Sequence, residues 1–114
     1  MAEQLRQGTG IQRVIKADAP TERADGTPLS ASEISHYNWY MDIDGGGFNI
    51  IGAAQLVNGE FSDTLQVDDV SPGVYDMYYT TVDTQGLESS PSQHLIIEVL
   101  PAFLAAPNPP TNVS

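Results

Sequence analysis

Short apolar runs that alternate with a period of two, each closed by turn-forming residues, limit this chain to β-structure. The clearest run extends from Val74 to Thr81, where Tyr75, Met77 and Tyr79 alternate with the residues between them. Successive side chains of a strand point to opposite faces, so this period indicates one buried and one exposed face. Such runs recur about every 8–15 residues, and no helical period exceeds one turn. The pattern predicts a single all-β sandwich.

The expected strands are separated by segments rich in Gly, Pro, Asp and Ser, the residues that favour turns and loops. The longest of these segments is the loop over residues 18–33, and Asp42–Gly47 has the composition of a hairpin turn. We expect strands at residues 11–17, 35–41, 48–56, 61–67, 74–81 and 94–100.

The chain divides into three parts. Residues 1–10 are polar and are predicted to form a flexible N-terminal arm, and residues 11–100 form the sandwich. Residues 101–114 form a C-terminal arm whose four prolines favour extended backbone and exclude a central strand.

Charge is distributed unevenly along the chain. The four basic residues all lie in the first 23 positions, whereas residues 24–114 hold twelve of the fifteen acids and no Lys or Arg. An acidic body repels phosphate groups, so we expect no nucleic-acid partner and no insertion into a membrane. A basic arm beside an acidic body favours salt-sensitive docking onto a protein partner. The predicted contact residues of this kind are Arg6, Arg13, Lys16 and Arg23.

No catalytic, metal or cofactor site can be assigned from the residue pattern. The chain has no cysteine, which excludes disulfides and thiol chemistry, and its two histidines are 58 positions apart. Asp42-x-Asp44 begins like a calcium-binding loop, but Ala53 stands where the last carboxylate ligand should be. A plain hairpin turn is the better interpretation, and Asp63, Asp68 and Asp69 are interpreted as solvated acids. We therefore expect no enzyme and no cofactor.

The segment from Val70 to Ser92, V-x-P-G-x-Y-x-M-x-Y-x-T-V-D-x-x-G-x-E-S-x-P-S, resembles a fibronectin type III domain of bacterial or bacteriophage type. The resemblance covers its E–F corner, F strand, F–G loop and the entry to strand G, and extends more weakly over residues 11–100. It implies an immunoglobulin-like sandwich in which the hydroxyl of Tyr75 bonds back to the backbone of the corner.

Two departures from that family matter. Its usual tryptophan on strand B is missing, because the only tryptophan is Trp39. No alternating pattern precedes Ile11, so the sandwich is expected to lack a strand A of its own, while residues 106–114 resemble the start of such a strand. Two interpretations stay open: the tail adds a strand to a neighbouring subunit, or it is the linker to a following domain. The tail residues assigned to partner contact are Phe103, Leu104, Pro107, Pro109, Pro110 and Val113.

Aromatic residues supply a second candidate surface. Alternation puts Tyr37 and Trp39 on the core face of one strand and Tyr40 on the outer face, where Tyr78 of a neighbouring strand also lies. Tyr40 and Tyr78 are candidates for contact with a partner, or else they stabilise the sheet as a cross-strand pair.

The resemblance implies a non-enzymatic structural module. The stretch from Ala17 to Gly26 is similar to small fibronectin-like proteins of tailed bacteriophages, which predicts a capsid-decoration, head-fibre or tail-associated subunit. Its partners would be other virion subunits or copies of itself. An N-terminus without an export signal favours assembly in the host cytoplasm over secretion. The alternative is an extracellular spacer or adhesion module from a larger bacterial enzyme or surface protein, with carbohydrate contact as a further possibility.

Overall fold

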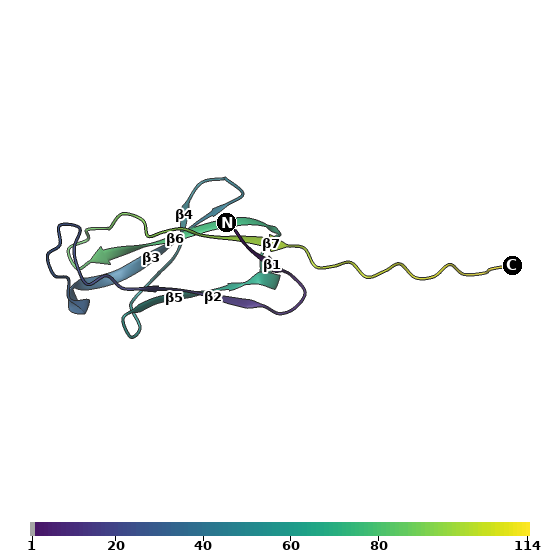
Figure 1. The fold of residues 1–114 in the computed structure, drawn as a ribbon, viewed down its shortest axis with the longest axis horizontal. Helices are drawn as coiled ribbons and strands as arrows, with labels where there is room; N and C mark the ends of the chain where they lie inside the picture. Colours follow the sequence, from purple (N-terminus) through teal and green to yellow (C-terminus); the bar gives the residue numbers. More distant parts are fainter. Residues whose placement is uncertain (1) are drawn as a thin grey trace.

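The computed structural model describes residues 2–114 and is nearly all-β, with two sheets packed face to face (Figure 1). The larger sheet has the strand order β1-β7-β6-β3-β4, and the smaller pairs β2 with β5. Two single-turn 3₁₀ helices, η1 and η2, connect strands. The strands are β1 (Glu3–Arg6), β2 (Gln12–Asp18), β3 (Ile34–Ile43), β4 (Asn49–Ala54), β5 (Glu60–Gln66), β6 (Gly73–Asp83) and β7 (Leu95–Leu100); η1 spans Ala31–Glu33 and η2 spans Val67–Asp69.

The core lies between the sheets and is largely aromatic. The prediction that Tyr37, Trp39, Met77 and Tyr79 face it is confirmed, because all four are buried. Tyr37 stacks on Phe61 of the opposite sheet with ring centroids 4.5 Å apart, and meets Tyr79 edge-on at 5.3 Å. Such contacts add to the hydrophobic stabilisation of the buried rings.

The Asp42–Gly47 segment is a hairpin turn, as predicted. The Asp42 carboxylate accepts hydrogen bonds from the backbone N–H groups of Gly45 and Gly47. Asp44 accepts from the Val74 N–H at 2.7 Å and so ties the hairpin to the start of β6. A Cβ at position 73 would lie 2.6 Å from the Asp44 carboxylate, which explains Gly73. Both carboxylates are thus occupied in closing the turn.

The N-terminal arm corrects the sequence-based expectation. Residues 3–6 are not a flexible arm but form β1, which pairs in parallel with β7, so the sandwich does have a first strand. Gly8 and Gly10 then donate to the Asp68 carboxylate at 2.7 and 2.9 Å, which anchors the connection to β2. The strand escaped prediction because it has four residues and a single large apolar side chain, Leu5, so it shows no alternation. Met1 of the predicted arm lies outside the described residues.

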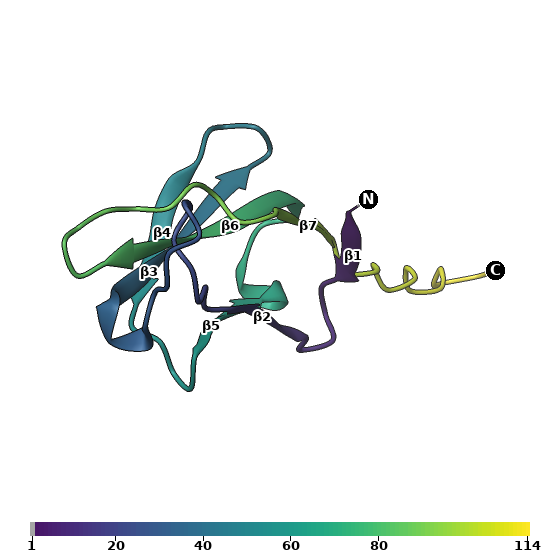
Figure 2. The same cartoon turned by 60° about the vertical axis from the view of Figure 1, so that its left-hand side comes forward.

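The C-terminal arm leaves the sandwich as extended chain, and Figures 1 and 2 both show it projecting away from the sheets. Residues 101–114 have no secondary structure and are exposed throughout. Only its root is held: the Arg6 guanidinium donates to the Pro101 carbonyl at 2.9 Å and lies 3.8 Å from the Phe103 ring centroid. No helix within residues 2–114 is long and apolar enough to cross a membrane.

Candidate interaction surface

The four basic residues do not gather into one patch. Arg6 holds the root of the C-terminal arm, and Arg13 pairs with Glu3 of β1 at 2.8 Å. Lys16 is exposed on β2 and makes no ion pair with any of residues 2–114. The four residues of the predicted basic surface are therefore separated: the three arginines make internal contacts, and Lys16 makes no ion pair among residues 2–114.

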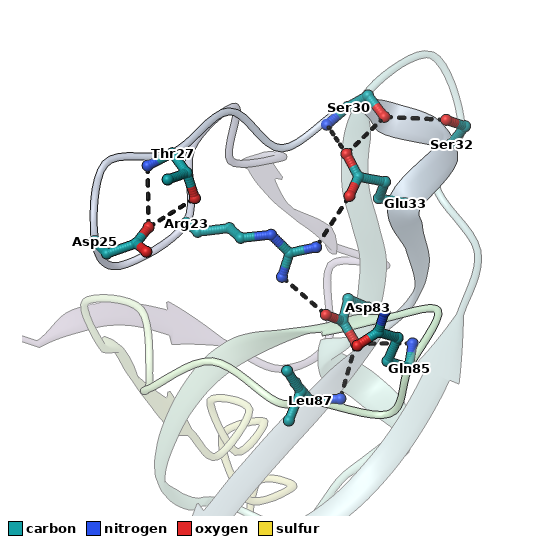
Figure 3. Close-up of polar contacts among 9 residues, drawn as sticks. All are labelled: Arg23, Asp25, Thr27, Ser30, Ser32, Glu33, Asp83, Gln85 and Leu87. Carbon is teal, nitrogen blue, oxygen red and sulfur yellow. Dashed lines mark hydrogen bonds and ion pairs between the residues drawn. The ribbon is translucent and has the colours of Figure 1, made fainter.

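Arg23 is the centre of a polar network at the far end of the sandwich (Figure 3). Its guanidinium donates to Asp83 at 2.9 Å and to Glu33 at 3.1 Å. Asp83 is buried at the end of β6, and its second oxygen accepts from the backbone N–H groups of Gln85 and Leu87. The hydrogen bond from Arg23 holds the pKa of Asp83 below its usual range. Arg23 therefore fixes the loop after β2 against β6, an internal role that the sequence did not indicate.

Tyr40 and Tyr78 lie opposite each other on the outer face of the large sheet, as predicted. Their rings stack with centroids 4.8 Å apart, and Phe48 and His94 each lie 5.0 Å from Tyr78. This geometry is that of a stabilising cross-strand pair. The role of these rings in partner contact stays a prediction.

Glu88 accepts hydrogen bonds from three side chains, a role that the sequence did not indicate. Its carboxylate accepts from the Tyr40 hydroxyl at 2.6 Å, from the Thr80 hydroxyl and from the Asn38 amide. These donors hold the pKa of Glu88 below its usual range. Its donors come from β3 and β6, up to 50 positions away, so no local pattern could have revealed the cluster.

The chain from Glu88 to His94 stays close to β6 without forming a regular strand. Serine hydroxyls replace part of the backbone ladder: Ser92 Oγ accepts from the Tyr79 N–H and Ser89 Oγ accepts from the Thr81 N–H, both at 2.9 Å. Pro91 has no N–H to donate. This segment therefore follows the large sheet and leaves the flank towards β2 open.

A groove runs along that flank between β2 and residues 88–95. It consists of two hollows of about 360 and 400 Å³ that share Ala17, Asp18, Tyr79 and Ser92. We call it the flank groove. Its lining is of mixed character. The apolar lining residues are Ile15, Ala17, Leu29, Trp39, Met77, Tyr79 and Leu87, and charged residues at its border include Arg13, Lys16, Asp18, Glu22 and Glu88.

The outer edge of β2 borders the flank groove and carries unpaired backbone groups. The odd-numbered residues of β2 direct their backbone N–H and C=O groups towards β5. Two bonds show this: the Val67 N–H donates to the Ile11 carbonyl, and the Ala19 N–H donates to the Gly59 carbonyl. In an antiparallel ladder the residues between them direct N–H and C=O to the other side. Within residues 2–114 no strand pairs with that side of β2. The Arg13 guanidinium, which pairs with Glu3, also donates to the Val14 carbonyl on this side. The open stretch therefore comprises the Val14 N–H and both backbone groups of Lys16 and Asp18.

The indole of Trp39 also lines the flank groove, and its buried Nε1–H has no hydrogen-bond partner among the described residues. A buried donor left unpaired is costly, typically by about 1–3 kcal/mol.

Among residues 2–114, no three His, Asp or Glu side chains lie together as metal ligands. Comparisons with protein-family models, with curated proteins and with solved structures found no match.

Proposed function

We propose that this chain is a non-enzymatic assembly module of the fibronectin type III, immunoglobulin-like class, and a structural subunit of a bacteriophage virion. Two features support the fold assignment. The order β7-β6-β3-β4 facing β2-β5 corresponds to strands G-F-C-C′ facing B-E in immunoglobulin-like sandwiches. The Tyr75 hydroxyl donates to the Ser71 carbonyl across the turn before β6, which is the corner contact that the resemblance implies.

The observation that carries the functional proposal is the open flank of the small sheet. Sandwiches usually shield free strand edges, because an unpaired edge is a template for another chain. Here no strand within residues 2–114 pairs with the Val14–Asp18 edge, which borders a partly apolar groove, while an arm without charged side chains projects from the same molecule. These are features of a subunit that joins protein neighbours.

The alternative is an extracellular spacer or adhesion module. The similarity of residues 106–114 to the start of a following domain favours it. The outward-facing cluster of the half-buried Tyr40 and Tyr78 with the exposed Phe48 would be its carbohydrate-contacting surface.

Mass spectrometry of purified virions, compared with the bacterial surface and culture fluid of the same source, separates the two. Trypsin would leave residues 24–114 as one peptide, because no Lys or Arg follows Arg23, so a protease that cleaves after Glu is required. The proposal expects peptides of the sandwich at stoichiometric levels in the virion. Their confinement to the bacterial surface or culture fluid would contradict it and support the alternative.

A further inference from the structure

The open edge of β2 needs an extended occupant with one apolar side. A strand added there bonds to the Val14 N–H and to both backbone groups of Lys16 and Asp18, three residues whose side chains are exposed. In an antiparallel arrangement, residues of the added strand that form these bonds turn their side chains outward, as their β2 partners do. The residues between them turn theirs into the flank groove.

The C-terminal arm has this alternation over residues 107–113. One set of alternate positions is apolar or β-branched: Pro107, Pro109, Thr111 and Val113. The other set is polar except for one proline: Asn108, Pro110 and Asn112. If the first set faces the flank groove, two of the three prolines occupy positions where no N–H is required by β2.

The arm is directed away from its own β2. Arg6 holds Pro101 and Phe103 at the end of β7, and the chain beyond them extends from the sandwich (Figure 2). Residues 101–106 can span about 20 Å when extended, which is enough to separate two sandwiches.

We infer that residues 107–113 of one copy bind as an added strand on the Val14–Asp18 edge of a second copy, with Pro109, Thr111 and Val113 in the flank groove. This inference rests on the proposed function and names the partner of the open edge. In this register the Thr111 side chain also enters the groove. Because tail and edge are different surfaces, the contact is head-to-tail and extends into chains of subunits.

Complementation between two variants tests the inference by sedimentation velocity from micromolar to millimolar concentration. One variant ends at Ala106, so it lacks the tail strand but keeps the edge. The other, Lys16→Pro, keeps the tail but loses an edge donor that no described strand uses. We expect the full chain to associate progressively, each variant alone to remain monomeric, and their mixture to form a one-to-one dimer.

Substitutions in the tail give a second test that does not alter the sandwich. Val113→Asp places a charge in the groove and is expected to weaken association by about tenfold or more, whereas the matched Asn112→Asp changes it by less than about threefold. Trp39 is the only tryptophan, so its fluorescence reports binding of a synthetic 105–114 peptide to the truncated chain. Because residues 101–114 carry no charged side chain, association is expected to vary little with salt.

Three results would overturn the inference: unchanged association after truncation at Ala106, equal effects of the Val113 and Asn112 substitutions, or a full chain that stays monomeric throughout. If the full chain is monomeric and Val113→Asp makes the β2 edge more exposed, the tail binds the edge of its own sandwich. That result also overturns the inference. None of these results affects the mass spectrometry of purified virions, so the proposed function is tested separately from this inference.

Discussion

At the scale of single residues, Asp63 is the acid whose environment is most unusual. It lies partly buried on β5, where Oδ2 is 3.1 Å from the Tyr79 hydroxyl, and that hydroxyl also donates to the Ile15 carbonyl at 2.9 Å. One hydroxyl proton cannot serve both acceptors fully. A protonated Asp63 could donate to Tyr79 and resolve the competition. Burial raises the pKa of Asp63 above its usual range, although hydrogen bonds from tyrosines oppose this.

We predict that Asp63→Asn does not destabilise the protein near neutral pH and stabilises it by up to about 1 kcal/mol. A raised folded-state pKa means that ionisation of Asp63 disfavours the folded state as pH rises above the usual carboxyl range. The amide mimics the protonated acid, so the gain should disappear at about pH 3, where the wild-type carboxyl is itself protonated.

Urea unfolding as a function of pH measures this effect. Asp69→Asn is the matched control, because it removes the same charge from an exposed side chain. Destabilisation by Asp63→Asn that is the same at neutral and acidic pH would contradict the assignment.

At the scale of elements, the corner before β6 is fixed by one side chain. Tyr75 is buried, and its hydroxyl reaches back four residues to the Ser71 carbonyl. We predict that Tyr75→Phe keeps the buried ring but lowers the free energy of unfolding by about 0.5–1.5 kcal/mol.

Chemical denaturation at neutral pH checks this value. Tyr78→Phe serves as the control, because the Tyr78 hydroxyl makes no hydrogen bond to any of residues 2–114. If the two substitutions have equal effects, the corner hydrogen bond contributes nothing to stability.

The elements also show how far sequence reasoning extends. Strands with alternation, such as β6, and the Asp42–Gly47 turn were predictable because their signals are local. β1 was not, because a four-residue strand with Leu5 as its single large apolar side chain shows no alternation, and its pairing with β7 is brought about only by the fold. Arg23 and Glu88 were missed as internal hubs for a related reason: their partners are brought together only by the fold.

At the scale of the whole molecule, the candidate surface depends on where the first strand pairs. Because β1 joins β7 and not β2, the large sheet gains a strand while the small sheet keeps an open edge. The extended arm gives the molecule dimensions of 82 × 28 × 21 Å. The sequence indicated both an incomplete sandwich and a projecting arm. In the structure, the position without a strand is the one next to β2 in the small sheet.

The charge distribution also has a different meaning in the folded molecule. Arg13 and Arg23 are paired with acids of the same chain, and Arg6 holds the root of the C-terminal arm. The molecule therefore does not have the free basic N-terminal arm that the sequence predicted. The flank groove instead presents apolar side chains and unpaired backbone groups, beside Lys16, which makes no ion pair with the described residues.

Amide hydrogen exchange along β2 tests most directly whether this edge is the interaction surface. In the chain truncated at Ala106, the amides of Val14 and Lys16 should exchange rapidly, while those of Ile15 and Ala17, bonded to β5, are protected. In the concentrated full chain, the account predicts that protection extends to Val14 and Lys16. Association that leaves these two amides as exposed as in the truncated chain would contradict the account.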